Sequence, residues 1–217
     1  NQIANDAFLR NKKILVTGGA GSIGSEIIRQ LLKASPEMIV AADSNETALF
    51  HLSNEFQNEP KTICQLLNIT NKHKLEDLFK EHNFDLVFHA AAYKHVSVIE
   101  NNPEEGLYNN IIGTYYLKYL AQRYGVEKFV MISTDKAVNP TNVMGASKRF
   151  CELLVHMDNE KGHTQFITTR FGNVLGSNGS VVPIFKKQID QGGPVTVTDP
   201  EITRYFMTIP EASKLVL

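Results

Sequence analysis

The chain has 217 residues, enough for one domain with a full core or for one domain and part of a second. Its 22 basic and 23 acidic residues nearly cancel, which argues against nucleic acid or an anionic membrane surface as the main partner. The two cysteines lie far apart and outside any Cys/His cluster, so we expect no metal site, no disulfide framework and a reducing, cytoplasmic setting.

The two ends of the chain lead to separate expectations. No apolar run approaches the roughly 20 residues that cross a bilayer, and the first residues do not form a signal peptide. Because the chain begins with Asn1 rather than Met, we expect that an upstream region is missing. Residues 210–217 resemble the first turns of a helix that is cut short.

The first recognisable unit is a strand, a glycine-rich loop and a helix. The β-branched run 12–17 leads into the loop 18–24, and apolar residues then recur with a helical period from Ile27 to Leu32. Glycines permit a tight turn and let backbone N–H groups at a helix N-terminus approach a pyrophosphate. This order of elements predicts a dinucleotide-binding loop, and a purely structural glycine turn is the alternative.

A second predicted strand, residues 37–43, ends in Asp43, about 20 residues after the last glycine of the loop. A carboxylate at this point accepts hydrogen bonds from the adenosine ribose and repels a 2′-phosphate. Because no Arg or Lys occurs at residues 44–46, the sequence favours NAD over NADP. Asp43 as a helix N-cap is an alternative that does not exclude the first role.

Further apolar runs alternate with helical patterns along the rest of the chain. The runs cover residues 62–67, 85–89, 128–133 and 164–170, and the helical patterns cover residues 71–81, 103–124 and 142–157. Strands that alternate with helices predict an α/β fold with a parallel, doubly wound sheet of Rossmann type.

Polar residues follow two of these runs at the edge where parallel sheets bind ligands. Thr134, Asp135 and Lys136 are therefore candidates for chemistry, with a solvated turn as the alternative. In the helix that follows, Met144 and Lys148 lie four residues apart and project from one face.

The run 85–89 continues into small residues at 90–92, which allow a loop to pass close beneath a cofactor. Lys94 and His95 follow at the same edge of the sheet, where they face either a substrate or solvent. His89 lies within the run, and we predict a packed, hydrogen-bonded histidine rather than an acid or a base.

With these pieces in place the sequence resembles the extended short-chain dehydrogenase/reductase family over nearly its whole length. Residues 17–24 resemble the cofactor loop of that family, residues 89–92 its fourth-strand motif and residues 110–114 its central-helix signature. Met144-x-x-x-Lys148 occupies the place of the Tyr-x-x-x-Lys motif.

Two longer stretches narrow the resemblance. Residues 133–148 and 170–183 are similar to the bacterial nucleotide-sugar 4,6-dehydratases of capsule, lipopolysaccharide and protein-glycan synthesis, which act on UDP-N-acetylglucosamine. The methionine variant is similar to the retaining branch, whose members often carry an N-terminal membrane region. The resemblance implies a UDP-sugar substrate, a homo-oligomer and a cytoplasmic protein or the cytosolic domain of an inner-membrane protein.

The reaction that this resemblance implies starts with hydride transfer from sugar carbon 4 to NAD. Water then leaves across carbons 5 and 6, and the hydride returns to carbon 6. By resemblance Asp135 is the acid for the departing hydroxyl and Lys136, in a neutral state, is the base at carbon 5, although the reverse assignment stays open. Thr134 would hydrogen-bond the carbon 4 oxygen, and Lys148 would hold the nicotinamide ribose.

Met144 is the departure that matters, because a thioether cannot carry the hydroxyl proton that the family's tyrosine carries. We suggest Thr134 with a water for that task. The expected cofactor residues are Gly18, Ala20, Gly21, Ser22, Ile23, Gly24, Asp43, Asn68, Ile69, Ala90, Ala91, Ala92 and Lys148. The expected substrate residues are Lys94, His95, Asn173, Ser180, Val181 and Arg204, with residues 195–198 near the uracil; a surface ion pair is the alternative for Arg204.

We expect residues 1–172 to form the NAD-binding domain and residues 173–217 a partial substrate-binding region, in which the chain returns to the Rossmann core near 204–217. Two other functions stay open. An epimerase on the same fold shares the first oxidation but needs no acid/base pair for elimination. A non-catalytic NAD-sensing protein would suit the missing tyrosine.

Overall fold

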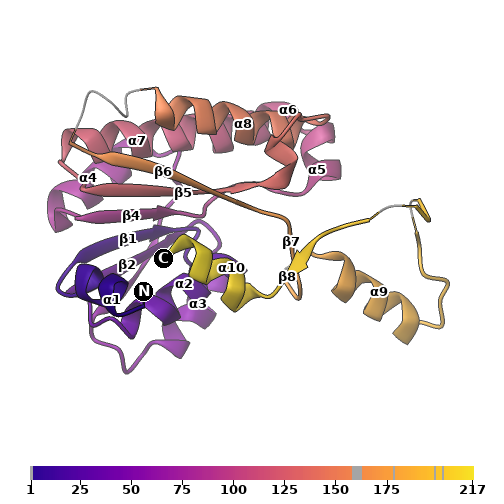
Figure 1. Cartoon of the computed structure of the whole chain (residues 1–217), viewed down its shortest axis with the longest axis horizontal. Coiled ribbons are helices and arrows are strands. Elements are labelled where there is room, and N and C mark those ends of the chain that lie inside the picture. Colours follow the sequence, from indigo (N-terminus) through magenta and orange to yellow (C-terminus); the bar gives the residue numbers. More distant parts are fainter. Residues whose placement is uncertain (1, 158–162, 178, 198, 202) are drawn as a thin grey trace.

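The computed structural model describes residues 2–157, 163–177, 179–197, 199–201 and 203–217, and a parallel sheet lies at its centre (Figure 1). The sheet consists of six strands in the order β3-β2-β1-β4-β5-β6, and each neighbouring pair is parallel. Their bounds are β1 Lys13–Thr17, β2 Met38–Asp43, β3 Thr62–Leu66, β4 Leu86–His89, β5 Lys128–Thr134 and β6 Gln165–Phe171. The predicted Rossmann-type sheet is confirmed.

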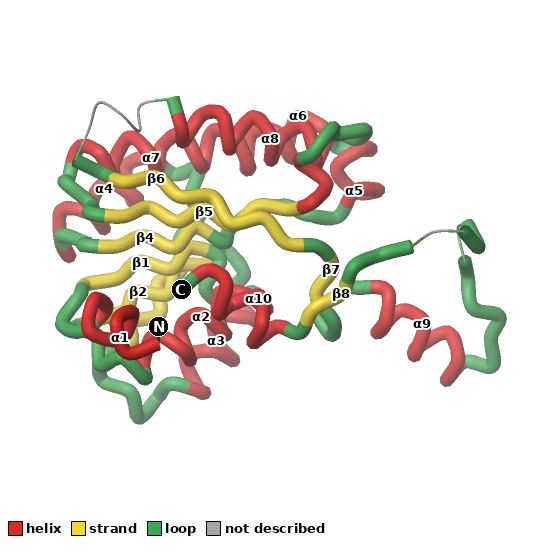
Figure 2. The backbone as a smooth tube through the Cα atoms, viewed as in Figure 1, coloured by secondary structure: helices red, strands yellow, loops and turns green. Residues whose placement is uncertain are grey.

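Helices cover both faces of the sheet (Figure 2). One face carries α4 (Lys72–His82), α7 (Gly113–Arg123) and α8 (Val143–His156), and the other carries α1 (Gln2–Leu9), α2 (Ser22–Leu32), α3 (Glu46–Glu55) and α10 (Ile209–Val216). Successive strand residues alternate between the two layers, so that Leu15 packs on the first face and Val16 on the second. Because both faces are buried, the strands are almost continuously apolar, which made them recognisable in the sequence.

The helix predicted over residues 103–124 is continuous but irregular. It consists of α6 (Pro103–Leu107), a π-helical turn (Tyr108–Ile112) and α7. Asn110 lies in this turn, and its side-chain amide bonds the backbone N–H of Tyr93 at 2.8 Å, the carbonyl of Tyr93 at 3.0 Å and Ser147 Oγ at 3.0 Å. The wider turn thereby ties the segment after β4 to α8, which a regular helix would not do.

The last part of the chain leaves the sheet and then returns to it. β7 (Asn173–Val174) pairs with β8 (Phe206–Met207), and between them α9 (Val181–Asp190) projects away from the body with no buried residue (Figure 1). α10 packs against α2, where Gln30 Nε2 donates to the carbonyl of Pro210 at 3.2 Å. The domain boundary at residues 172/173 stays a prediction.

Membrane-spanning helices and metal clusters are both absent from the part of the chain that the structure describes. There, no helix combines the length and the apolar character that crossing a membrane requires. No cluster of three or more His, Cys, Asp or Glu side chains that could hold a metal ion occurs in the same described residues.

Phe129 offers a test of the core. Its ring is fully buried in β5 against the rings of Phe166 and His89. We expect Phe129→Ala to lower the free energy of unfolding by about 3–5 kcal/mol, because the sheet cannot collapse into the space that the ring leaves. Urea unfolding measures the loss, and Phe50→Ala, at a residue 56% exposed, is the matched control. Equal losses in the two variants would contradict this packing.

Candidate active site

A cavity of about 950 Å³ opens at the carboxyl ends of the strands β1, β2, β4, β5 and β6. Most of the predicted site residues line it, namely Gly18, Gly21, Ser22, Ile23, Gly24, Asp43, Asn68, Ile69, Ala90, Ala91, Ala92, Lys94, His95, Thr134, Lys136, Met144, Lys148, Asn173, Ser180 and Val181. Ala20, Asp135 and Arg204 do not line it. The sheet therefore gathers the predicted cofactor and substrate residues into one space.

Backbone contacts hold the glycine loop in a shape that suits a pyrophosphate. Gly18 has φ +66°, and a Cβ there would lie 2.6 Å from the backbone nitrogen of Ala91. A Cβ on Gly24 would collide with the carbonyl oxygen of Gly18. The N-cap of α2 is Gly21, which makes no side-chain capping bond, and the residues at this end of the helix line the cavity, where a helix N-terminus favours an anionic ligand.

Asp43 is fixed by two backbone N–H groups at the end of β2. Its Oδ2 accepts from Ala20 N at 3.0 Å and its Oδ1 accepts from Asn45 N at 2.9 Å. Asn45, not Asp43, caps α3, because its side chain accepts from Ala48 N at 3.0 Å. The capping alternative for Asp43 is therefore wrong. Ala20 contributes by holding this carboxylate rather than by lining the cavity.

His89 is a neutral structural histidine, as predicted. Burial, with a smaller effect of the Lys148 charge, lowers the pKa of His89 to about 3. Thr114 uses its hydroxyl proton to bond the carbonyl of Asn110 at 2.6 Å, so His89 Nε2 donates to Thr114 Oγ1 at 2.9 Å. His89 Nδ1 then accepts from Thr17 Oγ1 at 2.7 Å. This chain of bonds joins the end of β1 to α7.

The polar triplet after β5 forms a hydrogen-bonded group at the cavity wall. Thr134 Oγ1 donates to Asp135 Oδ1 at 2.9 Å, and Lys136 Nζ donates to the same oxygen and to Asn173 Oδ1, both at 3.2 Å. Burial alone would raise the pKa of the Asp135 carboxyl, but the bonds from Thr134 and Lys136 outweigh it and lower that pKa. Asp135 is therefore an ionised, half-exposed group that bonds two residues of the cavity wall.

Met144 and Lys148 lie on the first turns of α8, and both are buried. The helix begins where Asn142 accepts from Gly145 N at 2.8 Å, and Gly145 packs so closely on the Lys136 carbonyl that a Cβ would collide with it. Burial lowers the pKa of the Lys148 ammonium, although the charges of nearby Cys151 and Glu152 oppose the effect. Lys148 thus places a desolvated cation on the cavity wall.

The loop that ends at α9 covers part of the cavity. Gly179, at φ +69°, lies so close to the His95 ring that a Cβ would collide with it. Ser180 lines the cavity, and its Oγ is buried without a hydrogen-bond partner within the described chain. Arg204 does not line the cavity, and its Nη1 donates to the carbonyl of Thr203 at 2.8 Å. Of the predicted uracil segment, Thr198 lies outside the described residues, and Val195 does not line the cavity.

The sequence analysis missed one wall of the cavity and a buried ion-pair network beside it. The wall comes from α5 (Val96–Asn101) and α6, with the lining residues Val98, Ile99, Asn102, Glu105, Gly106 and Asn109. No motif marks these positions, and the nearest signal was the signature over residues 110–114.

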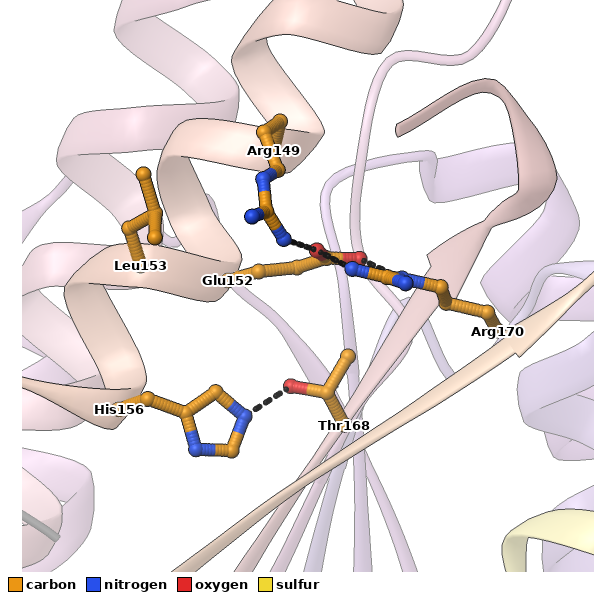
Figure 3. Close-up of a pocket in the computed structure, with 6 residues that line it drawn as sticks. All are labelled: Arg149, Glu152, Leu153, His156, Thr168 and Arg170. Atoms are coloured by element: carbon orange, nitrogen blue, oxygen red, sulfur yellow. Dashed lines mark hydrogen bonds and ion pairs between the residues drawn. The ribbon is translucent and has the colours of Figure 1, made fainter. Parts of the chain in front are cut away.

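The network centres on Glu152 in α8 and lies at a second cavity of about 350 Å³ (Figure 3). Glu152 accepts from Ser133 Oγ at 2.6 Å, from Arg170 Nε at 2.8 Å and from Arg149 Nη1 at 3.0 Å. Although burial raises it, these bonds bring the pKa of Glu152 down to about 2. The spacing in the sequence could have indicated that Glu152 lies near the site, because it follows Lys148 by four residues and therefore lies on the same helix face.

Gly24 gives a test of the glycine loop. We expect Gly24→Ala to weaken the binding of a nicotinamide dinucleotide at least roughly tenfold, or about 1.4 kcal/mol, because the added Cβ must push the Gly18 carbonyl aside. Isothermal titration measures the affinity. Gly125→Asn is the control, since Gly125 also has a positive φ, +68°, but nothing lies near its Cβ position. Unchanged affinity in Gly24→Ala would remove this loop from the binding site.

Comparison with known proteins identifies relatives over almost the whole chain. The family described as polysaccharide biosynthesis protein matches residues 14–217. The capsular polysaccharide biosynthesis protein CapD of Staphylococcus aureus is 51% identical over 214 residues, which make up 96% of this chain and 36% of that protein. The UDP-N-acetylglucosamine 4,6-dehydratase (inverting) of Campylobacter jejuni is 38% identical over 215 residues, 97% of this chain and 64% of that protein.

A solved structure agrees with these relatives. The UDP-glucose 4-epimerase of Thermus thermophilus, in complex with NAD, superposes with a TM-score of 0.80 at 26% identity, over 93% of this chain and 72% of that one. The chain spans about a third of the length of the capsule protein and 64% of that of the dehydratase. The NAD-bound neighbour and the shape of the glycine loop together support a nicotinamide cofactor. The chain belongs to the polysaccharide biosynthesis protein family, within the nucleotide-sugar-modifying short-chain dehydrogenases/reductases.

Proposed function

We propose that the chain is the catalytic region of an NAD-dependent 4,6-dehydratase that converts UDP-N-acetylglucosamine into the UDP-4-keto-6-deoxy sugar for surface polysaccharide synthesis. The observation that carries the proposal is the hydrogen-bonded group of Thr134, Asp135 and Lys136 at the cavity wall. An elimination needs an acid and a base beside the sugar, and this group supplies both. The homo-oligomer and the membrane region ahead of residue 1 stay predictions.

The residues of the cavity fit a nicotinamide dinucleotide. Gly18 and Gly24 let the loop pack closely on the backbone of Ala91 and on itself at the N-terminus of α2, where a pyrophosphate would lie, and Asp43 is held where it would meet the adenosine ribose. Lys148 would hold the nicotinamide ribose from α8. When bound, the nicotinamide accepts the hydride from sugar carbon 4 and returns it to carbon 6.

The oxidation also needs an acceptor for the proton of the carbon 4 hydroxyl. Met144 cannot take it, but Thr134 Oγ1 lines the cavity and already donates its own proton to the ionised Asp135. A sugar hydroxyl that donates to Thr134 can therefore pass a proton through it to Asp135. Thr134 then acts without the water suggested from the sequence, and Asp135 becomes the protonated acid that the next step requires.

In the elimination the proton on carbon 5 would go to Lys136, and the carbon 6 hydroxyl would take a proton from Asp135 and leave as water. When a hydride has returned to carbon 6, Lys136 would give a proton back to carbon 5, so that Lys136 is neutral and Asp135 ionised again. The Asp135 side chain is 45% exposed and is bonded to Thr134, so its proton would reach the departing hydroxyl directly or through Thr134. This order requires a neutral Lys136. The reverse order, with Asp135 as base and Lys136 as acid, is the second candidate because Lys136 donates to Asp135 and Asn173 in the structure.

Product analysis in deuterated water tests the activity and the order together. We expect the enzyme, as the full-length protein without added reductant, to release a sugar that has lost water. A lysine base mixes its proton with two solvent deuterons, so at least about two thirds of the product should carry deuterium at carbon 5 in a single turnover. Mass spectra measure the loss of water, and proton spectra measure the deuterium at carbon 5. Protium retained at carbon 5 would favour the carboxylate as base.

Variants of the triplet separate the steps. Thr134→Val and Asp135→Asn should each block formation of reduced nicotinamide, whereas Lys136→Ala should allow it and block the loss of water. Thr134→Ser, which keeps the hydroxyl, is the matched control. An unchanged sugar from wild-type protein shown to bind both ligands would sink the proposed activity. A product epimerised at carbon 4 would instead establish the epimerase, and no reaction with any sugar would favour the NAD-sensing role.

Asp43 tests the preference for NAD. We expect the protein to bind NAD more tightly than NADP, because a 2′-phosphate would meet a carboxylate that two backbone N–H groups hold in place. Asp43→Asn should reduce the ratio of the two affinities roughly tenfold, or about 1.4 kcal/mol. Glu46→Gln, an exposed acid nearby that does not line the cavity, should leave the ratio unchanged. Equal binding of both dinucleotides to the wild type would refute this role.

A further inference from the structure

Glu152 is a buried anion that the proposed reaction does not use. Its side chain is 3% exposed, and four hydrogen bonds reach its two oxygens, from Ser133, Arg149 and both Nε and Nη2 of Arg170. Figure 3 shows Arg149 and Arg170 converging on this carboxylate from opposite sides. The side chains of Arg149 and Arg170 are 45% and 40% exposed, so the buried group that depends on these hydrogen bonds is the carboxylate of Glu152.

The partners of Glu152 come from the elements that carry the active site. Ser133 immediately precedes Thr134 in β5 and itself lines the large cavity. Arg170 pairs with Ser133 across the β5–β6 ladder. Glu152 therefore binds β5 and β6 at the pair Ser133 and Arg170, which immediately precedes the last pair of the ladder.

The same two strand ends meet again on the cavity side. Three residues after Arg170, Asn173 accepts from Lys136 Nζ at 3.2 Å. The triplet and the segment 171–173 are therefore held together at two points. On the cavity side the Lys136–Asn173 bond joins them, and on the face of the sheet that α8 covers Glu152 binds the neighbouring residues Ser133 and Arg170. α8 joins them through Glu152, and Lys148 lies one helical turn earlier on that helix.

We propose that Glu152 is a positioning residue that fixes Thr134, Asp135 and Lys136 against Asn173 and α8, so that its loss slows elimination more than cofactor binding or oxidation. This inference rests on the proposed function. Oxidation needs the cofactor site, Thr134 and Asp135, whereas elimination needs Lys136 and the leaving hydroxyl aligned with them at the same time. A displacement of about 1 Å is enough to cost roughly 100-fold in such a step.

Glu152→Gln tests the proposal, because it keeps the shape and removes the charge. We expect NAD affinity and KM to change less than about threefold, and the elimination rate to fall roughly 10- to 100-fold. Reduced nicotinamide, followed by its absorbance, should then accumulate during turnover, as it does not in the wild type. The matched control is Glu55→Gln, which removes a carboxylate held by Arg29 at the exposed α2–α3 surface.

Amide hydrogen exchange provides a readout that needs no substrate. In Glu152→Gln, exchange should quicken at residues 134–137 and 171–174 and stay unchanged in the loop 18–24. If Glu152→Gln does not fold, Ser133→Ala removes one bond to the carboxylate without unpairing an arginine, and the same pattern is expected in milder form.

Three results would overturn the proposal. The first is a lowered melting temperature with every rate unchanged per folded molecule, and the second is an equal loss of oxidation and elimination. The third is unchanged exchange at both segments. Should the wild-type protein itself fail to oxidise the sugar, the proposed function falls, while the exchange data still decide whether Glu152 positions these segments.

Discussion

The backbone ladder of the parallel sheet is the constraint on which the rest of this structure depends. Parallel strands all end at one edge, and here the ladder between β5 and β6 continues to the pair Thr134–Phe171. The segments that follow Thr134 and Phe171 therefore begin next to each other. The Lys136–Asn173 bond is a consequence of that register, because both side chains leave from adjacent strand ends. A slip of one residue would turn every side chain to the opposite face and separate them.

The glycine loop obeys the same constraint at the other half of the edge. β1 lies between β2 and β4, so the loop that follows it is flanked by Asp43 on one side and by Ala90 and Ala91 on the other. The bond from Ala20 to Asp43 and the close contact of Gly18 with Ala91 use this neighbourhood. A cofactor that stretches along the edge would thus meet the residues of both halves, and Thr134 would face its reactive end.

Sequence reasoning succeeded where a local pattern had one physical cause. The strands were visible because two covered faces demand apolar runs, and His89 was assigned correctly because a histidine within such a run must be packed. It failed where the cause lay in distant partners. Asn110 lies in the π-helical turn and bonds the backbone of Tyr93, and the signature over residues 110–114 did not identify this partner. The residues near Glu152 in the sequence likewise do not show that Arg170, on another element, binds its carboxylate.

The proposed dehydratase and an epimerase differ in where the proton of the carbon 4 hydroxyl goes. An epimerase must return that proton to the same oxygen, so it is best served by a single group that holds the proton beside the oxygen. A dehydratase ends with a ketone and never returns it. In the atom balance of the proposed reaction, the carbon 4 hydroxyl proton and the carbon 6 hydroxyl are together the water that is lost. Thr134 joined to Asp135, and Asp135 joined to Lys136, form a route that leads such a proton away from its oxygen towards the leaving group. With Met144 in place of a tyrosine, α8 places no phenol four residues before Lys148 to hold the proton for return, and under the proposed function this combination suits elimination.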